Sequence, residues 1–101
     1  LTRLCDSIYN YAVAHRLKCV AICTGSIYED TVIDSEYLSL SSRLEASGIQ
    51  VLVGIDSVKD PAPDLILVAT LVHVAYYSPV YPDAKMIVVS TSTVSTRFIN
   101  S

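Results

Sequence analysis

The residues best suited to chemistry are the thiol and hydroxyl groups of Cys23-Thr24-Gly25-Ser26. They stand between a short apolar run at 19–23 and a segment with helical periodicity, so they fall where a strand passes into a helix. Backbone N–H groups at a helix N-terminus lower the pKa of a thiol and bind phosphate. The pattern predicts either a reactive Cys23 with Thr24, Gly25 and Ser26 around a phosphate, or a buried strand-end cysteine with Ser26 as a helix cap.

Two carboxylates, Glu29 and Asp30, follow this junction closely. Negative charge near the thiol disfavours both a thiolate and a bound phosphate, so we expect the pKa of Cys23 to be raised. The sequence excludes a cysteine-dependent phosphatase, because its loop needs an arginine soon after the cysteine and none occurs before Arg43. It also excludes a dinucleotide-binding loop, which needs further glycines.

His73 comes just after the apolar run at 65–69, near the end of a predicted strand. It suits a general acid or base, or else a partly buried loop histidine. Tyr76, Tyr77 and Tyr81 follow it among prolines, and predict either a contact surface for another chain or a covering loop in the core. No cysteine and histidine spacing is typical of a zinc site, so we expect neither a metal nor a cofactor.

The elements that position these residues follow from periodicity. Short apolar runs predict strands at 19–23, 49–55, 65–69 and 86–89, and helical spacing predicts helices at 1–16 and 29–47. We also expect a short helical turn within 71–85 and a closing helix after residue 91, with Val94, Phe98 and Ile99 on one side.

Helices between strands imply parallel strands joined by right-handed crossovers. The predicted fold class is α/β: a small doubly wound, Rossmann-like or flavodoxin-like sheet of about four parallel strands in the order 2-1-3-4, with helices on both faces. We expect helix 1–16 and the closing helix on one face, and helix 29–47 on the other.

Composition limits the class of protein. The 101 residues suffice for a single α/β domain, 1–101, in which an N-terminal helix at 1–17 precedes a sheet core at 18–101. We expect this domain to be excised from a longer chain, since it opens without methionine. The net charge of −3 and the scattered basic residues argue against nucleic-acid contact, and no apolar run is long enough for a membrane. Three cysteines without a paired pattern favour a cytoplasmic location.

The order of the elements resembles the enzyme IIB domains of the bacterial phosphotransferase system, in particular the mannitol, galactitol and ascorbate types. In that family a first strand ends in a phosphoryl-carrying cysteine, followed by a loop rich in glycine and serine and then a helix. Cys19–Ile22 followed by Cys23-Thr24-Gly25-Ser26 is similar in placement, and the runs 64–70 and 82–89 resemble the third and fourth strands. The resemblance implies that Cys23 is a phosphoryl acceptor.

Residues 27–30 are large or acidic where the family has small residues, and the helix at 1–16 is extra. Both features are similar to degenerate relatives attached to transcription regulators. We therefore favour a regulatory or protein-interaction module rather than an enzyme, with other domains of the parent protein or a second copy as partners. The alternatives are an active phosphocarrier using Cys23, and a small-molecule-binding Rossmann-like domain or enzyme using His73.

Overall fold

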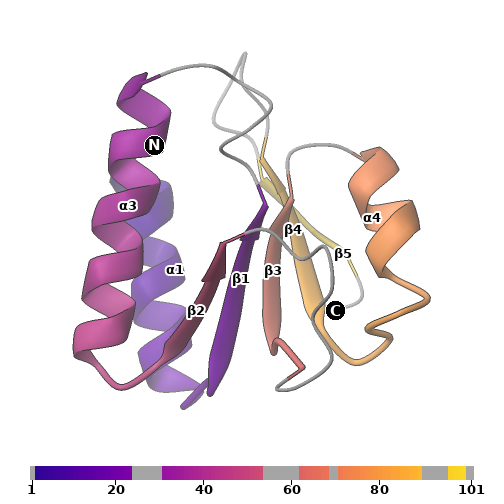
Figure 1. The fold of residues 1–101 in the computed structure, drawn as a ribbon, viewed down its shortest axis with the longest axis horizontal. Coiled ribbons are helices and arrows are strands. Elements are labelled where there is room, and N and C mark those ends of the chain that lie inside the picture. The colour runs from indigo at the N-terminus through magenta and orange to yellow at the C-terminus, as the bar shows by residue number, and fades with distance from the viewer. Residues whose placement is uncertain (1, 24–30, 54–61, 69–70, 90–95, 100–101) are drawn as a thin grey trace.

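One sheet with helices on both faces makes up the described part of the chain (Figure 1). The computed structural model describes residues 2–23, 31–53, 62–68, 71–89 and 96–99. In chain order the described elements are α1 (Thr2–Ala14), β1 (Cys19–Cys23), α3 (Thr31–Ala46), β2 (Gln50–Val53), β3 (Leu65–Val68), α4 (Leu71–Tyr77), β4 (Lys85–Val89) and β5 (Thr96–Ile99).

The strands form a single sheet in the order β2-β1-β3-β4-β5. All pairs among the first four strands are parallel, with β1 between β2 and β3. This confirms the α/β fold and the predicted order of four parallel strands. Every residue of β3, and all of β1 except half-buried Cys23, is buried, which explains why these strands read as continuous apolar runs.

The predicted closing helix is wrong, because Thr96–Ile99 forms β5 and pairs antiparallel with β4. The expected helix would contain at most about ten residues, and an isolated helix of that length is marginal in water. The outer edge of β4 offers free backbone groups, and Phe98 and Ile99 suit a strand as well as a helix. Pairing at this edge therefore prevails over helical spacing. Val94, the third residue of the expected helical stripe, lies outside the described residues.

Figure 1 shows α1 and α3 together on one face of the sheet and α4 on the other. The crossover through α3 leads from β1 to β2, and that through α4 leads in the opposite direction from β3 to β4. Right-handed crossovers then place α3 and α4 on opposite faces.

The expectation that α1 lies opposite α3 is wrong, since both helices contribute to the same apolar cluster. Because the tail forms β5 instead of a helix, α1 covers the β3 and β4 side of this face. The ring of Tyr11 accordingly lies 5.0 Å from Lys85 Nζ, at the start of β4.

Alternate residues of β1 face two separate apolar clusters. Val20 and Ile22 belong to the cluster under α1 and α3, together with fully buried Leu44. Ala21 belongs to the cluster under α4, together with Met86. The two-residue repeat of a strand thus joins both layers of the fold through one central strand.

The helices α1 and α3 end in the same way. At the end of α3, the Ile49 N–H donates to Leu44 O at 3.0 Å, the long bond of a Schellman cap. Gly48 takes the left-handed conformation that this cap requires, with φ of 82°. In α1 that position is held by Arg16, with φ of 52°, at a steric cost of about 1 kcal/mol.

Asp64 joins three strands at their amino ends. Its Oδ2 accepts the N–H groups of Lys18 at 2.7 Å and Cys19 at 3.3 Å. Its own N–H donates to Cys19 O at 2.8 Å, and its carbonyl accepts the Lys85 N–H at 3.1 Å. These four bonds connect the starts of β1, β3 and β4.

We expect Leu44→Ala to lower the free energy of unfolding by about 2–5 kcal/mol, because Leu44 is fully buried and its loss leaves a cavity. The matched control is Leu38→Ala on the exposed side of the same helix, expected to change it by less than about 0.5 kcal/mol. Urea denaturation of both variants measures the difference. Equal effects would show that the buried side of α3 is misassigned.

We expect Asp64→Ala to destabilise the fold by about 1–3 kcal/mol, since two backbone N–H groups at the start of β1 lose a charged acceptor. Glu45→Ala, an exposed carboxylate on α3, serves as the control and should have little effect. Thermal unfolding followed by circular dichroism compares the two. An unchanged midpoint for Asp64→Ala would mean that water replaces the carboxylate without loss.

Candidate functional site

Cys23 is the last residue of β1, at the edge where the parallel strands end. Its side chain is half-buried and packs against the apolar cluster under α4. This is the edge at which open parallel sheets bind ligands. The predicted phosphate-binding residues Thr24, Gly25 and Ser26, and the carboxylates at positions 29 and 30, lie outside the described residues. The loop around the thiol therefore stays a prediction.

Tyr81 belongs to the apolar cluster under α4 against which Cys23 packs. Tyr81 is buried, and burial raises its pKa above the ordinary 10.0, with a further increase from the neighbouring Cys23 and Cys19. A phenol with a raised pKa remains protonated at neutral pH, so it acts as a hydrogen-bond donor and not as a base. Sequence reasoning placed Cys23 and Tyr81 in separate hypotheses, and the fold unites them.

His73 lies on α4 and is half-buried. Its ring stacks with that of Tyr77, with 6.4 Å between the centroids, and Tyr77 also meets Tyr76 edge-on at 4.9 Å. Tyr77 and Tyr81 are core residues under α4, whereas Tyr76 is exposed. Of the three tyrosines predicted to form a contact surface, only Tyr76 faces solvent.

Four large apolar side chains are exposed on α4 and the turn that follows it. They are 57 to 76% exposed, and we call them the α4 surface: Leu71, Val72, Tyr76 and Val80. Val72 and Tyr76 are four residues apart on the helix, so they are neighbours. The described residues include only three other exposed large apolar side chains, on α1, α3 and β2. The α4 surface is therefore the main apolar group on the described exterior.

Sequence reasoning missed three of these four residues, although a signal was present. Residues 71–81 contain no aspartate, glutamate, lysine or arginine. Such a stretch has few polar side chains for solvent, so a short helix within it exposes apolar residues once Val74 and Tyr77 are buried.

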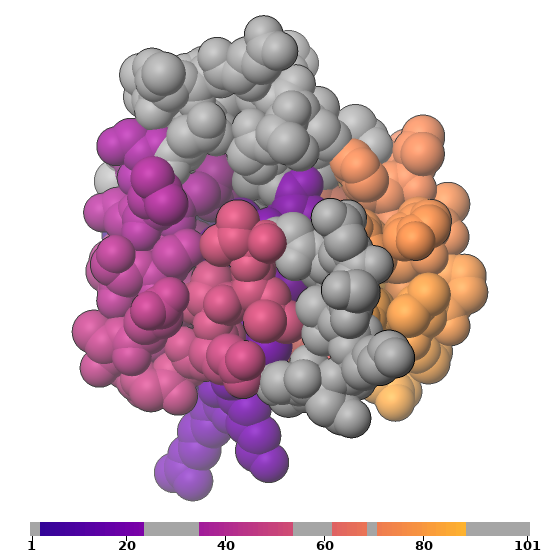
Figure 2. All heavy atoms as spheres, in the orientation of Figure 1, coloured from indigo at the N-terminus to yellow at the C-terminus, as the bar shows by residue number. Residues whose placement is uncertain are grey.

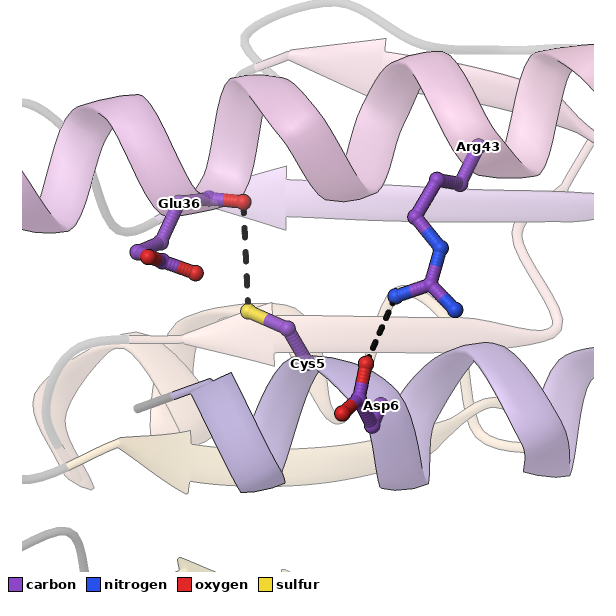
Figure 3. A network of polar contacts seen from close by, with 4 residues as sticks. All are labelled: Cys5, Asp6, Glu36 and Arg43. Atoms are coloured by element: carbon purple, nitrogen blue, oxygen red, sulfur yellow. Dashed lines mark hydrogen bonds and ion pairs between the residues drawn. The ribbon is translucent and has the colours of Figure 1, made fainter.

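A second group of polar contacts joins α1 to α3 (Figure 3). Arg43 of α3 reaches Asp6 of α1 at 2.7 Å and lies over the Tyr9 ring at 4.2 Å. The Tyr9 hydroxyl is 3.0 Å from the Ser47 hydroxyl. Both charged side chains are about half exposed, so this ion pair contributes at most about 1 kcal/mol. These contacts orient the two helices and show no feature of a catalytic site.

Cys5 points from α1 toward the Glu36 carbonyl on α3, with Sγ 3.9 Å from that oxygen (Figure 3). Burial, together with the nearby Glu36 charge, raises the pKa of Cys5 from 9.0 to about 11. A thiol held neutral in this way stabilises the fold fully below pH 9.0, and that contribution is lost as the pH rises toward about 11. Cys5 is therefore a structural thiol.

The described residues form neither a metal site nor a membrane-spanning helix. Within the described ranges, no three side chains of histidine, cysteine, aspartate or glutamate are placed to hold a metal ion. Among the same residues, every helix is too short or too polar to span a membrane. A hollow of about 240 Å³ lies between the last turns of α1 and α3, beside Arg16 and Ser47, at the edge opposite Cys23.

The chain matches no family model, no curated protein and no solved structure. Its function is accordingly inferred from the residues and their geometry.

We expect iodoacetamide to label the three cysteines of the folded chain, which form no disulfide, at different rates, with half-buried Cys23 first. At about pH 8, a pKa near 11 leaves Cys5 with roughly a hundredfold less thiolate than a pKa of 9.0 would. Burial and the Asp64 charge raise the pKa of Cys19 and protect it too. Peptide mass spectrometry over time gives the three rates. Labelling of Cys5 as fast as that of Cys23 would contradict the packing of α1 on α3.

Proposed function

We propose that this domain is a regulatory, protein-interaction module that binds its partner through the α4 surface. The observation that carries the proposal is the exposure of four large apolar side chains on one short helix and its turn. A single exposed apolar residue is normal in a soluble protein, whereas a group of them is typical of a binding site. Full burial of one such side chain contributes roughly 1.5–3 kcal/mol.

The chemistry of the partner follows from the charges. Residues 71–81 contain no aspartate, glutamate, lysine or arginine, so they favour an apolar face over a charged one. The partner that fits is an apolar face of another domain, in the same protein or in a separate one. The cysteines at positions 5, 19 and 23 form no disulfide, which supports a cytoplasmic setting for this contact.

The resemblance to enzyme IIB domains supports the regulatory part of the proposal. A domain of that type, without a working phosphoryl acceptor, would retain the fold as a support for contacts. A second candidate, an active phosphocarrier, is favoured by one observation: Cys23 lies at the carboxyl edge of the sheet. The two functions differ in their need for the thiol, since an interaction through α4 does not use it.

The proposal predicts contact at Tyr76 in the full-length protein. A photo-crosslinking amino acid at position 76, in the cells from which the protein comes, should trap a defined partner. In the same background, Val72→Asp should weaken capture about tenfold or more, since it places a charge in the apolar contact. Val13→Asp, at an exposed valine on the other face, and Cys23→Ser should leave capture unchanged.

The partner is then identified by mass spectrometry, purified, and titrated with the unchanged domain and with the three variants. A larger dissociation constant for Val72→Asp, with unchanged values for Val13→Asp and Cys23→Ser, would support the interaction module. Equal binding by Val72→Asp and by the unchanged domain would contradict the role of the α4 surface. Loss of binding in Cys23→Ser would instead favour the phosphocarrier.

A further inference from the structure

The strand β2 forms one edge of the sheet, and among the described strands it pairs only with β1. Figure 2 looks onto this edge and shows β2 at the surface beside α3. An edge strand presents unpaired N–H and C=O groups that can pair with another chain, and proteins normally protect such edges with lysine, proline or a bulge. The sequence of β2 is Gln-Val-Leu-Val, which contains neither lysine nor proline.

The direction of the backbone groups follows from one hydrogen bond. The N–H of Gln50 donates to Lys18 O at 2.9 Å, so Gln50 faces β1. Backbone groups alternate along a strand, so those of Leu52 also face β1, while those of Val51 and Val53 face outward. An antiparallel neighbour therefore has two residues of β2 with which to exchange hydrogen bonds.

An exposed leucine of α3 faces the same edge. The side of α3 toward α1 carries Arg43 and Ser47, and the side toward the sheet carries Tyr37. Leu38 lies about 100° further round the helix than Tyr37, away from α1. Because α1 covers the β4 side of this face, Leu38 lies on the side of the β2 edge, where it is 65% exposed.

The height of Leu38 along the strand can be derived from the helix cap. The Ile49 N–H donates to Leu44 O, so these two residues are level. Leu38 is six residues from Leu44, about 9 Å along the helix. Leu52 is three residues from Ile49, about 10 Å along the strand. Leu38 is therefore level with Leu52, the middle of the three apolar residues of β2.

We propose that a second copy of this chain pairs with β2, antiparallel, about a two-fold axis through Leu52. Val51 then exchanges backbone hydrogen bonds with Val53 of the second copy, and Val53 with its Val51, so one sheet runs through both copies. The two Leu38 side chains lie at the level of the axis and cover the junction. This contact is independent of the α4 surface and does not require the function proposed for it.

The placement of Leu38 favours a second copy over an unrelated extended peptide. A peptide satisfies the backbone groups of Val51 and Val53 but brings nothing defined to Leu38, whereas a two-fold axis brings an identical leucine. The charges permit the pairing as well. Glu45 lies seven residues from Leu38, about 10 Å along α3, so the two copies hold these carboxylates roughly 20 Å apart, beyond the screening length of about 8 Å.

The experiment is sedimentation of the chain over a range of micromolar concentrations. The expected result is an equilibrium between a monomer of 11.0 kDa and a dimer of twice that mass. Val53→Pro removes an outward N–H without affecting the pairing with β1, and Leu38→Glu places two charges at the axis. Each should raise the dissociation constant of the dimer about tenfold or more, and Val13→Glu on α1 should leave it unchanged.

Leu38→Glu leaves β2 intact and decides the test alone if Val53→Pro does not fold. Hydrogen exchange supplies a second measurement, because dimer formation should protect the amides of Val51 and Val53 at high concentration. A monomer at every concentration, or a dimer that Leu38→Glu leaves intact, would overturn the proposal. Association that is lost in Val72→Asp and retained in Leu38→Glu would assign the contact to the α4 surface and overturn it too.

Discussion

The bonds of Asp64 determine where the strands begin, and the rest of the sheet depends on that starting point. The strands β1 and β3 are apolar on both faces, so a shift of their register would not expose any polar residue. Asp64 removes this ambiguity by holding the chain at Cys19 and Lys85. With the register fixed, Cys23 comes level with Val68, the last residue of β3.

The sequence predicts the four parallel strands because each is a short apolar run bounded by turn residues. It does not predict β5, since Phe98 and Ile99 fit a helix and a strand alike. The free edge of β4 decides between the two, and that edge exists only in the folded sheet. The face occupied by α1 is unpredictable for a similar reason, because an amphipathic helix ahead of the first strand can pack on either side.

The candidate site shows the same division: the local position of Cys23 was predictable, and its packing against distant residues was not. The run 19–23 places Cys23 at the end of a strand, but nothing nearby in the sequence indicates that Cys23 and Tyr81 share an apolar cluster. The tyrosines show the limit most clearly. Val74, Tyr77 and Tyr81 follow helical spacing into the core, whereas Tyr76 points outward with Val72. Residue type alone predicts one surface of three tyrosines. In the structure α4 turns Tyr77 into the core and Tyr76 toward solvent, and Tyr81 is buried beyond the end of the helix.

Because α1 precedes the sheet in sequence but packs across it, it has a distinctive place in biosynthesis. The ribosome completes α1 before any of its partners exist: it rests on α3, and Tyr11 contacts Lys85 at the start of β4. The apolar side of α1 therefore stays uncovered while most of the domain is being translated. Within the described pairing, α1 belongs to no strand ladder, so its packing on α3 and the sheet holds it in place. Until those partners have been translated, the nascent chain presents the apolar side chains of Leu4 and Ile8 to the cell's chaperones.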